Sequence, residues 1–98
     1  MEKVLFTIKY EILPERRNDY LNVITELKTL IKAEGLESYS VYEVKGKPNT
    51  FAEVYSFSNK QAYEDFDDDP NERVDLLMNK LSDMIKQQST QYTTLFEI

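Results

Sequence analysis

The chain has 98 residues, of which 18 are acidic and 12 basic, so its formal net charge is -6. This length is that of one domain, and residues 1–98 are expected to form one. The sequence contains neither cysteine nor histidine. Their absence excludes disulfides, thiolate metal sites, histidine-ligated zinc or haem, and every nucleophile–histidine pair. The acidic charge argues against nucleic acid and anionic membranes as partners.

Residues 1–12 read MEKVLFTIKYEI and predict a strand. The segment is too short and too charged for a signal peptide or a membrane span, so a cytoplasmic location is expected. Apolar residues recur at every second position, which is the period of a strand with one buried face. The residues on that predicted core face are Val4, Phe6, Ile8, Tyr10 and Ile12.

A helix is predicted over residues 15–34. Pro14 suits the first helical position, where its missing N–H costs nothing. Gly35 suits the left-handed residue that often ends a helix. Apolar residues between them follow helical spacing, namely Tyr20, Leu21, Ile24, Leu27, Leu30 and Ile31.

Residues 36–45 and 50–57 predict two further strands, joined by the turn Gly46-Lys47-Pro48-Asn49. With a four-residue loop, Val41 lies opposite Val54, and Tyr42 lies opposite Glu53. A shift of the loop by one residue would undo this assignment, because neighbouring side chains point to opposite faces of a strand.

The second helical region is predicted in two parts. Ser58 and Gln61 fit a capping box for a short helix that ends near Phe66. Asp69, followed by Pro70, then fits the cap of a longer helix. Acidic residues crowd positions 64–69, but they lack the glycine and the distal glutamate of a calcium loop, so no metal site is predicted. Residues 92–98 alternate again and predict a fourth strand.

The resulting order is β-α-β-β-α-β. This order predicts a ferredoxin-like α+β fold, a four-stranded antiparallel sheet with both helices on one face. The other face is predicted to carry four aromatic residues with a few polar ones, and such a patch exceeds what monomers usually expose. The residues assigned to this face are Leu5, Thr7, Lys9, Tyr42, Phe51, Glu53, Tyr55 and Phe57.

Three explanations can account for such a face: a second copy of the chain, single-stranded nucleic acid, or a misread strand register. RNA-recognition modules share this topology, but their third strand needs a basic residue, a glycine and interleaved aromatics. Here Asn49 and Thr50 take the first two places, and Glu53 takes an aromatic one. A homodimer with facing sheets around a cavity is therefore expected.

The run FAEVYSFSNKQAYEDF, residues 51–66, resembles the strand-to-helix segment of the antibiotic-biosynthesis-monooxygenase-like superfamily, the dimeric α+β barrels. The element order and the length match over the whole chain. In that family a strand acid and a tryptophan two residues later face the cavity, matching Glu53 and Tyr55. A helical histidine often follows an alanine by four residues; here the alanine is Ala62, and Phe66 takes the histidine position.

The resemblance implies cofactor-independent monooxygenation of aromatic or polyketide-like substrates, without cofactor or metal. Members that degrade haem need the missing histidine and are excluded. The alternative is a non-enzymatic homodimeric module that binds a ligand or a protein. A small aromatic ligand is the expected partner besides the second copy.

The candidate substrate-binding residues are Thr7, Lys9, Tyr42, Glu53, Tyr55 and Phe66. Lys9, Tyr42 and Tyr55 offer one charge and two hydroxyl donors that would stabilise a substrate anion. Lys9 and Glu53 are interpreted either as a pair that orients a polar ligand or as a cross-strand ion pair at the dimer seam. The two tyrosines equally suit ring packing with the hydroxyl directed to water or backbone.

Overall fold

The computed structural model describes residues 2–66 and 72–98. Its strands are β1 (Val4–Glu11), β2 (Leu36–Glu43), β3 (Thr50–Phe57) and β4 (Gln91–Phe96). Its helices are a short 3-10 turn η1 (Pro14–Arg16), α1 (Arg17–Leu30), α2 (Lys60–Asp65) and α3 (Glu72–Met84). No helix in the described ranges is long and apolar enough to cross a membrane.

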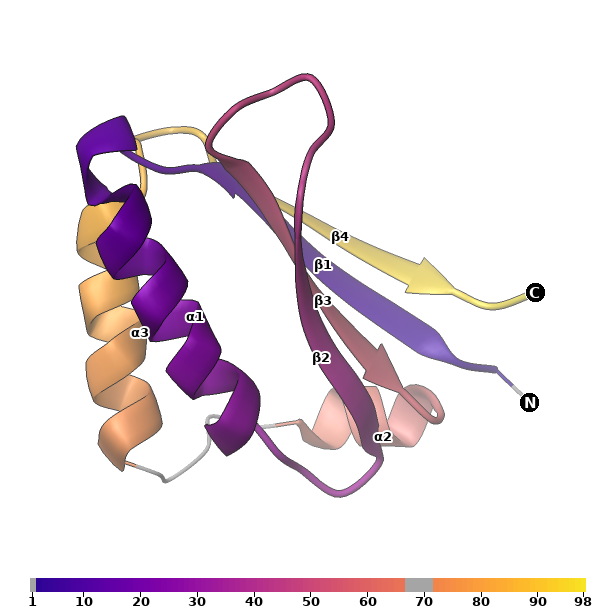
Figure 1. Cartoon of the computed structure of the whole chain (residues 1–98). Coiled ribbons are helices and arrows are strands. Elements are labelled where there is room, and N and C mark those ends of the chain that lie inside the picture. The colour runs from indigo at the N-terminus through magenta and orange to yellow at the C-terminus, as the bar shows by residue number, and fades with distance from the viewer. Residues whose placement is uncertain (1, 67–71) are drawn as a thin grey trace.

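The four strands form one sheet in the order β2-β3-β1-β4, with every neighbouring pair antiparallel. The two long helices α1 and α3 lie side by side over one face of this sheet, and α2 lies near one end of it (Figure 1). This arrangement confirms the predicted ferredoxin-like fold.

The facing of β3 corrects the sequence prediction. Phe51 pairs with Tyr10, Tyr55 with Phe6 and Phe57 with Val4, so the aromatic residues of β3 share a face with the predicted core residues of β1. That face is the one the helices cover, and Phe51, Tyr55 and Phe57 are buried there. The reason is area: burying large aromatic side chains removes far more apolar surface from water than burying the alternate set, Ala52, Val54 and Ser56.

The β2–β3 hairpin also differs from the prediction, by one residue. Val44 N–H donates to the Thr50 carbonyl at 2.8 Å, which closes a loop of residues 45–49. Gly46 and Asn49 both take positive φ within this loop. Val41 is consequently opposite Glu53, and Tyr42 is opposite Ala52. The predicted pairings of Val41 with Val54 and of Tyr42 with Glu53 are therefore wrong. Tyr42 itself lies, as predicted, on the face that the helices leave open.

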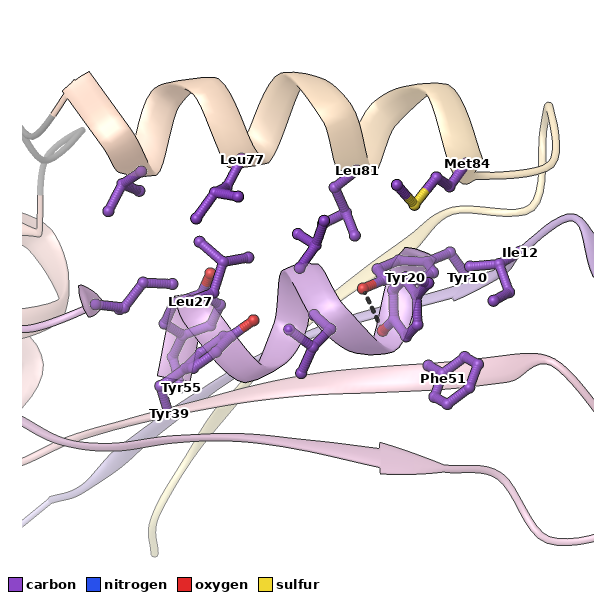
Figure 2. Close-up of a cluster of buried hydrophobic side chains, with 14 of the residues drawn as sticks. Tyr10, Ile12, Tyr20, Leu27, Tyr39, Phe51, Tyr55, Leu77, Leu81 and Met84 are labelled. Carbon is purple, nitrogen blue, oxygen red and sulfur yellow. Dashed lines mark hydrogen bonds between the residues drawn. The ribbon is translucent and has the colours of Figure 1, made fainter. Parts of the chain in front are cut away.

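The core fills the layer between the sheet and the two helices (Figure 2). From α1 it takes Tyr20 and Leu27, and from α3 it takes Leu77, Leu81 and Met84, all of them buried. These residues recur at helical spacing and confirm the predicted apolar stripes.

The helix boundaries differ from the prediction in detail. α1 ends at Leu30 because Ile31 is already extended, with ψ 109°, although its side chain still joins the core. α2 is capped by Asn59, whose side chain accepts from Ala62 N–H at 2.8 Å, and not by Ser58. The asparagine oxygen takes the capping role one residue later than predicted. The predicted cap at Asp69 and Pro70 lies outside the described residues.

Substitution of Gly35 tests how closely the chain before β2 approaches α2, and the same substitution at Gly46 is the control. Both have positive φ, 81° and 80°, but a Cβ on Gly35 would lie 2.4 Å from the Ala62 Cβ, whereas one on Gly46 would meet nothing within 4 Å. Gly46→Ala is expected to lower the free energy of unfolding by about 1 kcal/mol, the cost of a left-handed alanine. Gly35→Ala should cost ~1–3 kcal/mol more, because α2 must move. Urea unfolding measures both, and equal losses would contradict the close approach.

Candidate functional site

A buried carboxyl lies at the centre of the sheet. Glu53 is 2 % exposed and points from β3 into the layer beneath the helices, where the structure describes no other buried charged residue. The Tyr39 hydroxyl donates a hydrogen bond to Glu53 Oε1 at 2.7 Å. The hydroxyls of Tyr10 and Tyr55 also act to lower the pKa of Glu53 and so favour its ionised form. Phenols, and not a basic residue, therefore compensate the buried acid.

Four tyrosines, Tyr10, Tyr20, Tyr39 and Tyr55, surround this carboxyl and are called the phenol cluster below. The Tyr10 and Tyr20 hydroxyls lie 2.8 Å apart, joining β1 to α1 (Figure 2). The rings of Tyr39 and Tyr55 lie with centroids 4.9 Å apart on neighbouring strands. Each hydroxyl of a buried tyrosine requires a partner. The Tyr10 and Tyr20 hydroxyls partner each other, and the Tyr39 hydroxyl partners Glu53.

The electrostatics of the cluster favour neutral groups. Burial raises the pKa of Glu53, while the phenol hydrogen bonds, led by Tyr39, oppose that rise. Burial, reinforced by the neighbouring Glu53, raises the pKa of Tyr10, Tyr39 and Tyr55, and burial also raises that of Tyr20. The phenols thus stay protonated as donors, and the carboxyl is the group that exchanges a proton most easily.

A pocket of about 390 Å³ reaches this carboxyl from between α3 and the β1–β4 side of the sheet. It is called the α3–β4 pocket below. Glu53 and Tyr10 are buried at its inner end, and exposed residues of the α3–β4 turn lie at its outer end. Its described lining comprises Ile8, Tyr10, Glu53, Met78, Leu81, Ser82, Ile85, Lys86, Gln87, Gln88, Thr90 and Tyr92.

The structure separates the predicted site residues into two groups. Glu53 and Tyr55 lie on the helix side of the sheet. The Phe66 ring packs against the Tyr55 ring, with their centroids 5.6 Å apart, but Phe66 does not line the α3–β4 pocket. Phe66 instead lines a separate hollow of about 610 Å³ beside α2.

Thr7, Lys9 and Tyr42 lie on the other face of the sheet, so all six predicted residues cannot line one cavity within a protomer. The predicted pairing of Lys9 with Glu53 is wrong. Lys9 lies opposite Ala52 and Gln91, whereas Glu53 lies opposite Ile8. Because successive side chains alternate between faces, the one-residue offset sends the two charges to opposite sides of the sheet.

Sequence reasoning missed Tyr10, Tyr20 and Tyr39 as neighbours of the carboxyl. The available signal was chemical: Tyr10 and Tyr20 fell on predicted apolar faces, and each buried hydroxyl needs a polar partner. A carboxylate on an aromatic strand face is the complementary group. Joining the two observations required the correct facing of β3.

Glu53 and Glu43 provide opposite tests of these electrostatics. When folding raises the pKa of a carboxyl, that group adds to the stability of the folded state at low pH. This contribution is fully present below pH 4.5, the ordinary pKa of a glutamate, and is lost as the pH rises through the raised pKa. The stability of the native protein relative to Glu53→Gln should therefore fall as the pH rises from 4.5. Chemical unfolding at a series of pH values measures this difference, and a flat difference above pH 4.5 would contradict the raised pKa.

Glu43 is the control with the opposite sign. Its hydrogen bonds from Arg17, at 2.7 and 2.9 Å, and from the Asn49 backbone lower its pKa to about 2. Stability from this group is present above pH 4.5 and lost as the pH falls towards 2. The stability of the native protein relative to Glu43→Gln should therefore rise between pH 2 and 4.5 and stay constant above that range.

Solved structures share this fold over nearly the whole chain, whereas no protein-family model and no curated protein matches the sequence. A conserved protein from Methanosarcina mazei superposes with a TM-score of 0.78 at 17% identity, covering 97% of this chain and 92% of that one. A protein from Bordetella bronchiseptica, provisionally named an antibiotic biosynthesis monooxygenase, gives 0.77 at 10% identity, covering 100% and 99%.

A third structure, named antibiotic biosynthesis monooxygenase, gives a TM-score of 0.69 at 18% identity and covers 100% of this chain and 97% of that one. Identities this low establish the shared fold and not a shared reaction. The resemblance seen in residues 51–66 is thereby confirmed at the level of the fold: the chain has the architecture of the antibiotic-biosynthesis-monooxygenase-like proteins.

Proposed function

We propose that this protein binds a small aromatic or polyketide-like molecule in the α3–β4 pocket and oxygenates it without a cofactor. The observation that carries the proposal is Glu53, a buried carboxyl with a raised pKa that forms the inner end of the pocket. Acids in such surroundings are suited to take a proton from a substrate near neutral pH. The expected setting is the cytoplasm.

The pocket lining supports an aromatic ligand. Apolar side chains from three elements, among them Ile8, Leu81 and Tyr92, flank the path to Glu53. A volume of about 390 Å³ falls near the lower end of the range for small-molecule sites, ~300–1,000 Å³. Flat ligands of two or three rings match this space.

The chemistry needs one proton acceptor close to an acidic C–H. Glu53, as carboxylate, would take a proton from a ring methylene made acidic by a conjugated carbonyl. The resulting carbanion supplies electrons to dioxygen, a C–O bond forms, and loss of water leaves a new carbonyl. In sum, one methylene group and one dioxygen molecule become one carbonyl group and one water molecule, and the substrate is the only reductant. Tyr39 would hold Glu53 in place through its hydrogen bond.

We also propose that the protein forms a homodimer through the sheet face that the helices leave uncovered. The uncovered sheet face, called the open face below, carries Leu5, Thr7, Lys9, Tyr42, Ala52, Val54 and Leu95. Tyr42 is 60% exposed and Leu95 49%. The face is less aromatic than predicted, but it still combines apolar and β-branched side chains over all four strands, which suits a second copy.

Oxygen consumption with anthrone as substrate tests the catalytic proposal. Anthrone has three rings and a methylene group of the required acidity. Glu53→Gln keeps the size of the side chain but removes the proton acceptor, so the rate should fall ~100-fold, the usual effect of losing a general base. The matched control is Glu37→Gln, an exposed glutamate of β2, which should leave the rate unchanged.

A rate that survives Glu53→Gln would overturn the assignment of the proton acceptor. Tight binding of aromatic ligands with no oxygen uptake would favour the second candidate, a non-enzymatic ligand-binding module, because the pocket alone supports binding. Tyr42→Phe tests the sequence-based assignment of a substrate-binding role to the open face, since only that assignment predicts a change in rate.

Native mass spectrometry tests the dimer. Val54 lies at the middle of the open face, opposite Thr7 and Ser40, and Val54→Lys should shift the protein from twice the chain mass to the chain mass. Two desolvated lysines facing each other across an interface are strongly unfavourable. Leu76→Lys is the control, because Leu76 is 47% exposed on α3, away from that face. A native protein with the monomer mass would contradict the facing-sheet dimer.

A further inference from the structure

We propose that the ligand of the α3–β4 pocket is a hydroxyaromatic carboxylic acid, the keto tautomer of which carries the ring methylene required above. Its carboxylate binds Lys86 at the outer end while its ring hydroxyl meets Glu53 at the inner end. This inference rests on the proposed function and adds the substrate class. It uses a residue that neither the phenol cluster nor the proton transfer requires.

The backbone of Lys86 is fixed at the rim of the pocket. Lys86 N–H donates to the Glu11 carbonyl at 2.8 Å, which ties the end of α3 to the end of β1. The Ser89 hydroxyl bridges the same two segments, lying 2.6 Å from the Lys86 carbonyl and accepting from Glu11 N–H at 3.1 Å. A lysine whose main chain is held at both its N–H and its carbonyl presents its flexible side chain from a constant position.

Lys86 is also the single cationic residue in the described lining of the pocket. Its Nζ lies 3.6 Å from a Glu11 carboxylate oxygen, and the two side chains are 59% and 41% exposed. An exposed ion pair of this kind adds little to stability, so replacing Glu11 by a ligand carboxylate as the partner of Lys86 costs little free energy. The attraction between Lys86 and the ligand carboxylate is stronger than that between Lys86 and Glu11, because a bound aromatic ring excludes part of the solvent at the pocket rim.

The polarity of the pocket changes along its depth. Glu53 and Tyr10 are buried, Ile8 and Ile85 are partly buried, and Gln87 and Gln88 are exposed beside Lys86. Gln88 keeps a positive φ of 64°, which is uncommon for a residue with a side chain and shapes the turn at the rim. A ligand that satisfies both ends carries one polar group for Glu53, an aromatic body and one anionic group for Lys86.

Two matched compounds test the inference: 2-naphthol, and 6-hydroxy-2-naphthoic acid, which adds only a carboxylate at the far end of the rings. Both fluoresce, so titration with the native protein gives both dissociation constants. The acid should bind about tenfold more tightly, the contribution of one hydrogen bond to a charged group. Lys86→Met should reduce this ratio to about one by weakening the acid alone, and Lys86→Arg should largely restore it. Lys47→Met, in the exposed β2–β3 turn, should leave the ratio at its native value.

The outcomes separate the two proposals. Equal binding of both compounds to the native protein, or a preference for the acid that persists in Lys86→Met, would overturn this inference and leave the proposed function standing. Binding of neither compound would overturn both. A preference that falls equally in Lys86→Met and Lys47→Met would mean general charge attraction, and would likewise overturn the role of Lys86.

Discussion

The burial of the aromatic face of β3 under α1 and α3 is the constraint on which the other features depend. Phe51, Tyr55 and Phe57 all lie within that layer. Each such side chain contributes about 1.5–3 kcal/mol when it leaves water, so no arrangement of the sheet that exposed them would compete. The same strand carries Glu53 at the intervening position of that face, and the alternation of a strand takes the carboxyl inward with its neighbours.

A carboxyl forced into an apolar layer must be compensated, and the way it is compensated decides its chemistry. An arginine partner would hold the acid ionised and inert as a proton acceptor, as Arg17 does for Glu43 at the surface. Phenols instead donate hydrogen bonds without bringing a charge, so burial still raises the pKa of Glu53. The result is an acid whose pKa lies above its ordinary value and whose ionised form still has a hydrogen-bond donor in Tyr39. That combination is what the proposed role of Glu53 as a proton acceptor requires.

The sequence was sufficient for the elements because each depends on local periodicity. The alternation in residues 4–12 and the helical stripe from Tyr20 to Leu27 needed no information from elsewhere in the chain. The pairing of β2 with β3, and with it the facing of β3, depended on whether the loop before Thr50 contains an even or an odd number of residues. The hydrogen bond from Val44 to Thr50 closes the loop over residues 45–49, in which Asn49 takes a positive φ. Such a choice of loop is seldom visible in one sequence.

The sequence therefore indicated only some residues of the candidate site. Glu53 and Tyr55 stood out as polar groups on an aromatic strand, but Tyr20 and Tyr39 come from other elements and meet them only through tertiary packing. The end of α1 shows the same limit: Ile31 continues the apolar stripe, yet its backbone leaves the helix while its side chain stays in the core. Periodicity indicates which residues are buried more reliably than it indicates where a helix ends.

Alternate residues of β3 lie on opposite faces of the sheet and have different proposed roles. Glu53 and Tyr55 point to the pocket side, whereas Ala52, Val54 and Ser56 point to the open face, where the second copy is proposed to bind. The described lining of the pocket comes from one protomer. A dimer would nevertheless act on it mechanically, because a sheet covered on both faces bends less than one covered on a single face. Rigidity of β2 and β3 would keep the Tyr39 hydroxyl within hydrogen-bonding distance of Glu53, and such preorganisation affects how well a buried acid accepts a proton.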